Sequence, residues 1–387
     1  MILLLVFCLI VYGLVEYRRH VTQVRSIPMR IHVNGTRGKS SVTRLIAAGL
    51  REGGIRTVAK TTGTRARLIY EDGGEEPVVR HGKPNVIEQL KIFRIANRHD
   101  AQALVLECMA IRPELQSVSE RMMVHATLGV ITNVRGDHLD EMGPTLENVA
   151  LALSLTIPRK GIVFTAEREL LPIIVRQAKD LKAKVHAVGG DGIPEEVMSR
   201  FTYIEHRENV ALASAVCEFV GIDRETALQG MVKAVPDPGA LRRLTIRSSN
   251  KEIEFINAFA ANDPESTVSI WKQLRISSHA DRPLITIFYN REDRLDRTEE
   301  FGKLVAHELK ADHCILIGTA TPVVEHIAVK EGLDKRTIVN MAGMSPERIF
   351  EKVVELTPQK SLVVGIGNIV GAGEQVASFF ESKGTAA

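Results

Sequence analysis

Short hydrophobic runs alternate along most of the chain with longer stretches in which apolar positions recur every three or four residues. The short runs predict buried strands, and the longer stretches predict amphipathic helices. Strands separated by helices of this length indicate βαβ units around mostly parallel sheets, so we expect an α/β fold. The expected strands are 30–33, 57–60, 103–106, 128–132, 161–165, 184–188, 253–259, 284–289, 314–317, 338–341 and 362–366, and the main expected helices are 39–50, 86–97, 145–155, 166–181 and 207–220.

The sequence Pro236-Asp237-Pro238-Gly239 is the strongest break in this pattern. Proline restricts the backbone, glycine frees it, and stretches of this kind are typical of domain boundaries. The chain has 387 residues, enough for two domains with separate cores. We therefore expect a central α/β domain over 29–235 and a smaller α/β domain over 236–387, with the polar stretch 71–84 as an exposed excursion.

The N-terminus departs from the pattern of a soluble domain, because residues 1–15 are almost entirely apolar. As a helix this run spans about 22 Å, less than the roughly 30 Å of a hydrocarbon core, so the flanking tyrosines and arginines would have to complete a crossing. We expect 1–20 to be a single uncleaved anchor in the cell membrane, 21–28 to be a linker, and the catalytic domains to be cytoplasmic. A signal peptide normally has its charges before the apolar run, the reverse of the order here. A docking helix or a misassigned start would also explain the run.

Composition narrows the functional classes. With 44% hydrophobic and 25% charged residues the chain has the composition of a globular protein rather than a disordered one. A net charge of +3, without long basic tracts, gives no reason to expect a nucleic-acid partner. The four cysteines form no C-x-x-C pair, which favours a reducing compartment and disfavours a zinc site or a disulfide framework.

The first expected strand runs into the sequence Gly35-Thr36-Arg37-Gly38-Lys39-Ser40, which is followed directly by a helix. Glycines let the backbone bend around a phosphate, so that amide groups and the helix N-terminus point at its oxygens. Lys39 adds a positive charge, and the Ser40 hydroxyl suits Mg²⁺. The pattern is shorter than the full Walker motif, whose first glycine would stand at Val33. We expect a nucleotide phosphate site here; a glycine turn with a surface lysine is the alternative.

Two further strands end in residues that suit a metal site. Residues 103–106 lead into Glu107, and residues 128–132 lead towards Asp137, His138 and Asp140. The C-terminal ends of parallel strands form the ligand crevice of such sheets, so these side chains should lie beside the phosphate loop. Carboxylates near a nucleotide are typical Mg²⁺ ligands. The alternatives are a strand-end salt bridge for Glu107, a capping or core role for His138, and a helix cap at Asp140.

These motifs, in this order, resemble those of the Mur ligase superfamily. The chain after residue 28 is more similar still to the ligase subunits of bacterial poly-γ-glutamate (capsule) synthases. The resemblance is carried by the strings KTTGTRA, ECMAI, DHLDEMGPTLE, PDPGALR, FAANDPEST and VVGIGNIVGAGE. It implies a P-loop central ATPase domain and a smaller Rossmann-like C-terminal domain, preceded by the membrane helix.

The resemblance also implies roles for individual residues, with ATP and Mg²⁺, or Mn²⁺ in its place, as the cofactors. It assigns the ATP phosphates to the loop residues Gly35, Thr36, Arg37, Gly38, Lys39, Ser40 and Ser41. It assigns the adenine base to Asn209, the γ-phosphate to Arg242 or its neighbour Arg243, and the metal to Ser40, Glu107 and His138. The catalytic residues that it implies are Lys39, Glu107, His138 and Arg242.

Three departures from the family pattern bear on the substrate and the metals. Leu153 stands where many Mur ligases carry a carbamoylated lysine, so a carbamate that holds a second metal is not expected. Asn257 replaces the usual aspartate, and Asp263 is inserted before Pro264. The phosphate loop begins at residue 35, which leaves no room ahead of it for a UDP-binding domain and disfavours a UDP-muramoyl substrate.

The resemblance implies an ADP-forming ligase that polymerises glutamate through its γ-carboxylate by way of an acyl phosphate. The implied partners are glutamate, the growing poly-γ-glutamate chain, the membrane and other membrane subunits of a synthase. Whether the chain forms a homo-oligomer stays open. The alternatives are a folate-type polyglutamate ligase and a nucleotide-switched membrane adaptor without ligase activity.

Overall fold

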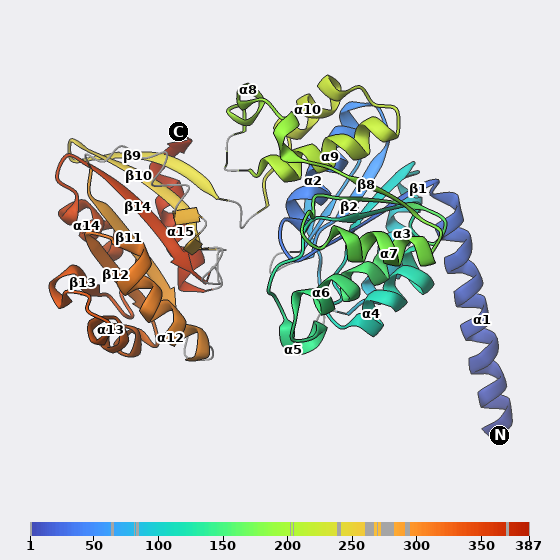
Figure 1. Ribbon diagram of the computed structural model, residues 1–387, viewed down its shortest axis with the longest axis horizontal. Coiled ribbons are helices and arrows are strands. Elements are labelled where there is room, and N and C mark those ends of the chain that lie inside the picture. The colour runs from blue at the N-terminus through green and yellow to red at the C-terminus, as the bar shows by residue number, and fades with distance from the viewer. Residues whose placement is uncertain are drawn as a thin grey trace. The chain divides into compact units, whose positions relative to one another are not determined.

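The chain folds into two compact units, each built around one sheet (Figure 1). The computed structural model describes residues 2–62, 66–80, 82, 85–201, 203, 205–237, 241–259, 267–268, 270–271, 282–290, 295–368 and 371–386. The first unit comprises Met1–Phe201 and Glu205–Asp237, and the second comprises Thr202–Ile204 and Pro238–Ala387. The chain therefore passes from one unit to the other inside the proline-rich break at 236–239.

The first unit has an eight-stranded sheet in the order β4-β3-β2-β5-β1-β6-β7-β8. From β2 to β8 all neighbours are parallel, and β3 and β4 add an antiparallel edge. This edge was not predicted, because short polar edge strands carry no hydrophobic pattern. Residues 71–80 are exposed or half-buried, as expected for this stretch, but they include the strand β4. The strands are β1 (Met29–Asn34), β2 (Thr57–Lys60), β3 (Arg67–Ile69), β4 (Glu75–Pro77), β5 (Ala103–Glu107), β6 (Leu128–Ile131), β7 (Ile162–Thr165) and β8 (Lys184–Ala187).

Helices cover both faces of this sheet. On one face α2 packs against α9 and α10, and the connections through α3, α4, α6 and α7 cover the other, as right-handed crossovers require (Figure 1). The helices are α1 (Ile2–Ser26), α2 (Lys39–Glu52), α3 (Glu88–Arg98), α4 (Pro113–Val118), α5 (Leu139–Met142), α6 (Leu146–Leu153), α7 (Leu171–Asp180), α8 (Glu195–Met198), α9 (Arg207–Phe219) and α10 (Arg224–Val232). A π-helical turn, η1 (Ser119–Val124), follows α4.

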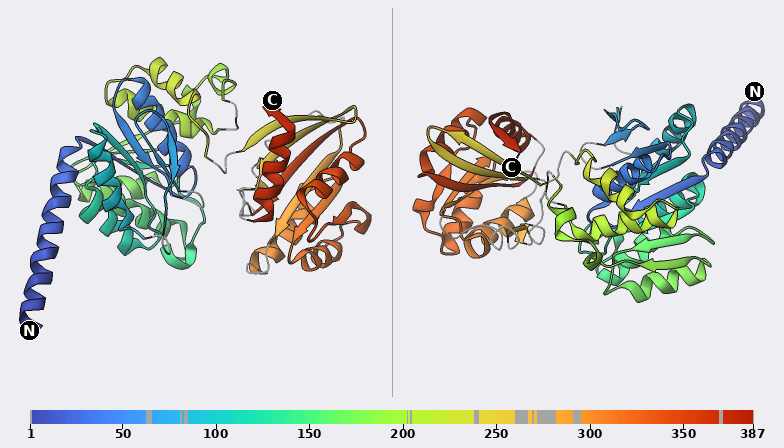
Figure 2. Two further views of the ribbon diagram at one scale, coloured as in Figure 1. Left: turned by 180° about the vertical axis from the view of Figure 1, so that it is seen from behind. Right: turned by 90° about the horizontal axis from the view of Figure 1, so that it is seen from above.

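Helix α1 bears on two expectations about the N-terminus. It continues without a break to Ser26, so most of the expected linker 21–28 is helical. Its C-terminal part is held because His20 and Val24 are buried and the His20 ring bonds the Met123 carbonyl at 2.8 Å. Its N-terminal part extends away from the rest of the unit in every view (Figures 1 and 2). Among the described residues no helix combines the length and the apolar character that a bilayer crossing needs, so the structure does not support the expected anchor.

The second unit has a seven-stranded sheet in the order β13-β12-β11-β14-β10-β9-β15. The five strands from β13 to β10 are parallel, whereas β9 and β15 are antiparallel additions that were not predicted. The strands are β9 (Arg242–Ser248), β10 (Lys251–Ala258), β11 (Leu284–Asn290), β12 (His313–Gly318), β13 (Ile338–Asn340), β14 (Lys360–Gly367) and β15 (Gly384–Ala386). The helices are α12 (Leu295–Leu304), α13 (Thr321–Lys330), α14 (Pro346–Leu356) and α15 (Ala372–Lys383).

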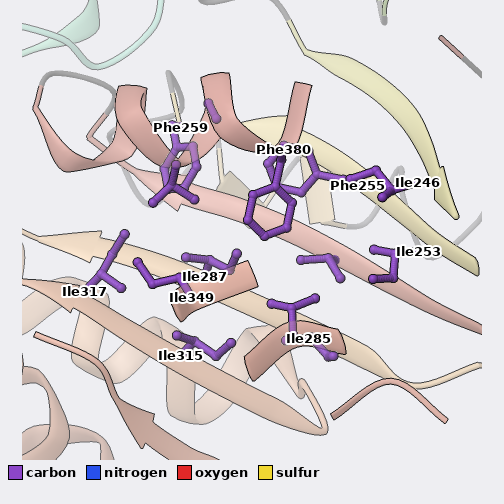
Figure 3. Close-up of a cluster of buried hydrophobic side chains, with 14 of the residues drawn as sticks. Ile246, Ile253, Phe255, Phe259, Ile285, Ile287, Ile315, Ile317, Ile349 and Phe380 are labelled. Carbon is purple, nitrogen blue, oxygen red and sulfur yellow. The ribbon is translucent and has the colours of Figure 1, made fainter. Parts of the chain in front are cut away.

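The core of the second unit lies on both faces of its sheet. On one face, aliphatic and aromatic side chains of β10, β11 and β12 meet Ile349 of α14 and Phe380 of α15 (Figure 3). On the other face, α12 and α13 contribute Phe301, Leu304 and Val324. The mostly parallel α/β fold expected from the sequence is therefore confirmed in both units.

Candidate nucleotide and metal site

The loop between β1 and α2 can be built only with glycine at two positions. Gly35 and Gly38 have φ values of 135° and 77°, which other residues rarely adopt. A Cβ atom at Gly35 would lie 1.9 Å from Oγ1 of Thr132, and one at Gly38 would lie 2.7 Å from Oδ1 of Asn209. The two glycines thus allow the loop to lie directly against β6 and α9, with the N-terminus of α2 at its end.

The residues that follow β6 hold this loop in place. Oδ1 of Asn133 accepts hydrogen bonds from the Thr36 hydroxyl at 2.7 Å and the Arg37 amide at 3.1 Å. The Asn133 Nδ2 and the Thr132 hydroxyl both donate to the Arg37 carbonyl, at 3.1 and 2.6 Å. The sequence analysis predicted no role for Thr132 or Asn133. Their position directly after a strand was the available signal.

The side chain of Lys39 folds back over the preceding residues of the phosphate loop. Its Nζ donates to the carbonyl oxygens of Gly35 at 2.7 Å and Thr36 at 3.1 Å. The ammonium charge therefore adds to the positive end of the α2 dipole and to the free amide groups of its first turn. Together these groups favour an anion such as a phosphate.

Ser40 and Glu107 come together as the sequence predicts. The Ser40 hydroxyl donates to Oε2 of Glu107 at 2.8 Å, and the Thr62 amide donates to the same oxygen at 2.7 Å. Glu107 is only 2% exposed. In the part of the chain that the structure describes, Glu107 makes no ion pair, so the salt-bridge alternative is not observed. A hydroxyl and a carboxylate oxygen beside a phosphate loop fit Mg²⁺, which takes one or two protein oxygens together with phosphates and water.

His138 is less well placed for a metal. Its side chain is 45% exposed, and its Nε2 lies 3.8 Å from Oδ1 of Asp137, whose other oxygen is 3.8 Å from Nη2 of Arg37. This contact places Asp137 beside the loop, as expected. Within the described ranges, however, no three His, Cys, Asp or Glu side chains gather closely enough to hold a metal. The structure therefore pairs Ser40 with Glu107, whereas the contact that it gives for the His138 ring is with Asp137.

Asn209 packs on the phosphate loop from the first turn of α9. Its Nδ2 donates to Oε1 of Glu205 at 2.8 Å, and both side chains are buried. Burial raises the pKa of Glu205, although bonds from Asn209 and the His206 amide counteract this. Sequence reasoning missed Glu205, because a single glutamate ahead of a helix matches no motif.

Arg242 and Arg243 lie on β9, in the second unit. Nε of Arg243 pairs with Oε1 of Glu254 at 2.9 Å. In the antiparallel register Arg242 stands opposite Asn257, whose amide donates to Oε1 of Glu381 at 3.1 Å. The proposed contact of either arginine with the γ-phosphate stays a prediction, as does the role of the loop 260–266, which lies outside the described residues.

Comparison with known proteins places the chain in a family. Residues 33–232 match the Mur ligase middle domain, and residues 244–383 match the poly-γ-glutamate synthase CapB C-terminal domain. The chain is 40% identical over 379 residues to the PGA synthase CapB of Bacillus subtilis, covering 96% of this chain and 95% of that protein. This chain belongs to the CapB family. The capsule biosynthesis protein CapB of Bacillus anthracis is also 40% identical, over 95% of this chain and 79% of that one.

Solved structures with much lower identity share the fold of this CapB family member. Folylpolyglutamate synthase from Thermotoga maritima aligns with a TM-score of 0.67 and 16% identity, over 95% of this chain and 93% of that one. MurF from Acinetobacter baumannii aligns with a TM-score of 0.69 and 14% identity, over 96% and 80% of the two chains. At these identities the likeness shows a common Mur ligase type of fold and no common substrate.

Proposed function

We propose that this protein is an ATP-dependent ligase that extends poly-γ-glutamate, adding each glutamate to the γ-carboxylate of the chain end. The observation that carries the proposal is the pairing of Ser40 with Glu107, 2.8 Å apart, beside a glycine loop that bears Lys39. Such an arrangement suits phosphoryl transfer from a nucleotide. The extensive likeness to PGA synthase CapB supports glutamate as the substrate.

The reaction needs two bond exchanges. An oxygen of the γ-carboxylate attacks the γ-phosphorus of ATP, the bond to the bridging oxygen breaks, and ADP leaves with that electron pair. The amine nitrogen of the incoming glutamate then attacks the acyl carbon, phosphate departs with the C–O electron pair, and the nitrogen gives its proton to solvent. Lys39 and the amide groups of the loop stabilise the charge that moves during the first exchange. Phosphorylation is required because a carboxylate is a poor electrophile and has no adequate leaving group.

Mg²⁺, or Mn²⁺ in its place, would be held by Ser40 and Glu107, and we propose His138 as a further ligand. When bound, the ion would neutralise phosphate charge. A folylpolyglutamate synthase/dihydrofolate synthase of this fold has been solved with Mn, AMPPNP and L-glutamate bound, which supports a divalent ion together with ATP. The second unit would supply the γ-phosphate arginine, from Arg242 or Arg243.

For the location, we propose that α1 holds the protein at the cell membrane, with both units on the cytoplasmic side. The support is the exposure of its apolar side chains, which reaches 86% at Leu3, and the basic flank at Arg18 and Arg19. Other membrane subunits of a synthase would be its partners there. Deletion of residues 2–15 should move the protein from the membrane to the soluble fraction in a flotation assay, and unchanged flotation would refute the proposal.

The ligase proposal is tested with membranes that contain the protein and its native partners. ADP release is measured with Mg²⁺, with and without L- or D-glutamate, and polymer is collected as acid-stable material. We expect glutamate-dependent release that Lys39→Ala abolishes and that Lys179→Ala, an exposed lysine on α7, leaves unchanged. Release without any dependence on glutamate would point to a nucleotide switch, and extension of added folate in preference to polymer would point to a folate-type ligase.

A further inference from the structure

Glu205 is a buried carboxyl group with one oxygen left over. Its side chain is 7% exposed and lies just before α9. Oε1 accepts the His206 amide at 2.9 Å and Nδ2 of Asn209 at 2.8 Å, whereas Oε2 makes no well-formed hydrogen bond among the described residues, although the nearby Ser41 side chain acts to lower the pKa of the carboxyl group. Burial of a carboxyl group without full hydrogen bonding is costly. We therefore look for a role other than stability for the buried carboxyl group of Glu205 beside the phosphate loop.

The contact with Glu205 decides which way the Asn209 amide faces. Oε1 of Glu205 accepts the His206 amide and, as a carboxylate oxygen, has no hydrogen to donate, so Asn209 turns its NH₂ group towards it. The carbonyl oxygen of Asn209 is then left on the side of the phosphate loop. A Cβ at Gly38 would be 2.7 Å from that oxygen and 3.1 Å from Nδ2.

We propose that Glu205 is a positioning residue that sets the choice of nucleotide base, by holding Asn209 with its carbonyl oxygen free to accept the 6-amino group of adenine. This rests on the proposed function and on the role at the adenine base that the family resemblance implies for Asn209. Guanine carries a carbonyl oxygen at position 6 in place of the amino group, so two acceptors would oppose each other. A site that leaves polar groups unpaired discriminates strongly against the wrong ligand.

The proposal requires a hydrogen-bond acceptor for the Asn209 NH₂ group at residue 205. It does not require that this acceptor carry a negative charge. Without an acceptor there, the Asn209 amide can rotate by half a turn and present its NH₂ group, which suits guanine. Glutamine keeps a carbonyl oxygen of the same reach. Methionine keeps the length of the side chain but removes the acceptor, and aspartate keeps the carboxylate but withdraws it by one methylene group.

The test is competition of ATP and GTP against a fluorescent ATP analogue, on the full-length protein with Mg²⁺. We expect wild type and Glu205→Gln to prefer ATP to a similar degree. In Glu205→Met the preference should fall by roughly tenfold to a hundredfold, the discrimination usual for one base contact. Glu205→Asp should also lower the preference for ATP over GTP. If Glu205→Met does not fold, the result for Glu205→Asp tests the proposal in its place. An unchanged preference in these variants, or an equal loss of both nucleotides, would overturn the proposal.

Wild type alone provides an independent measurement. Purine riboside triphosphate lacks the 6-amino group and should bind roughly tenfold or more weakly than ATP. If it binds as tightly as ATP, no acceptor reads that group and the proposal is wrong while the ligase function stands. If no nucleotide binds, the proposed function fails together with this inference.

Discussion

The hydroxyl group of Ser40 and the carboxylate of Glu107 are 2.8 Å apart, although 67 positions separate them in the chain. They meet because β1 and β5 are parallel neighbours, with Val33 directly opposite Glu107. Each strand delivers the residues at its C-terminal end to the same edge of the sheet, where α2 begins. The pairing is therefore a consequence of strand order, and it places two oxygen-bearing side chains beside the phosphate loop.

Replacement of Glu107 by glutamine should remove most of the activity while the fold persists. Glutamine preserves the volume but loses the negative charge that suits a divalent cation. We expect ADP release to fall by roughly 10²- to 10³-fold, the usual loss when one electrostatic contact of this kind is removed, and the Mg²⁺ concentration for half-maximal rate to rise. Glu114→Gln, an exposed carboxylate on α4, is the matched control and should leave both quantities unchanged. A Glu107 variant with the Mg²⁺ requirement of wild type would contradict a role at the metal.

The sequence predicted those parts of the site in which a residue of suitable chemistry follows a recognisable strand. A strongly hydrophobic strand precedes each of the residues Gly35, Lys39, Ser40 and Glu107. Their convergence could therefore be inferred from the sequence alone. Glu205 could not be inferred, because its importance comes from burial against Asn209 and not from a motif.

The missed elements have a similar explanation. Strand β4 (Glu75–Pro77) is short and polar, and it forms because β3 offers it an edge to pair with. Most of the linker expected over 21–28 is helical because His20 and Val24 have partners that lie far away in the sequence. Both cases depend on tertiary contacts, which local hydrophobic patterns do not encode.

Gly38→Ala should weaken nucleotide binding. The new methyl group would lie 2.7 Å from Oδ1 of Asn209, at a φ of 77° that already strains alanine. We expect the dissociation constant for ATP to rise by at least about tenfold. Displacement of Asn209 should reduce the binding free energy by more than the contribution of one hydrogen bond. Gly54→Ala is the control for general backbone strain: Gly54 follows the far end of α2, has a φ of 80° and has no atom within 4 Å of the added group, so this variant should bind ATP as wild type does. If the two variants lose equal affinity, backbone strain rather than the collision with Asn209 is the cause.

Arg44 should contribute far more to stability than the surface cations do. Its side chain is 3% exposed; Nη2 donates to Oε2 of Glu75 at 3.1 Å, and Nη1 donates to the Val235 carbonyl at 3.2 Å. Arg44→Met would remove a buried cation that pairs with Glu75 and, through Nε at 3.7 Å, with Oδ2 of Asp237, so the free energy of unfolding should fall by about 3–5 kcal/mol. Urea unfolding measures this difference.

Lys233 supplies the comparison for Arg44. Its pair with Glu52 is largely exposed, and Lys233→Met should cost less than about 1 kcal/mol. The double variant Arg44→Met, Glu75→Gln should recover part of the loss, because the unpaired charge is then absent. Equal unfolding midpoints for Arg44→Met and Lys233→Met would show that the buried pair contributes no more than the exposed one.

A buried ion pair beneath the phosphate loop should make stability fall as the pH rises. The fully buried His32 ring on β1 has Nδ1 2.8 Å from Oε2 of Glu120. Burial opposes protonation of the ring, but hydrogen bonds with Cys108 and Glu120 prevail and raise the pKa of His32 from 6.5 to about 10. The folded state therefore keeps a proton that the unfolded chain releases above pH 6.5.

The sign of the effect follows from this proton. The contribution of His32 to stability is complete below pH 6.5 and is lost between that pH and about 10, with a slope of up to about 1.4 kcal/mol per pH unit. Urea unfolding of the first unit at pH 6, 7, 8 and 9 should show this decline in wild type and in His186→Gln, whose histidine is exposed on β8. His32→Gln should be less stable at pH 6 and should decline less steeply. If wild type and His32→Gln lose stability in parallel, the proton does not reside on His32, and another group must account for the dependence.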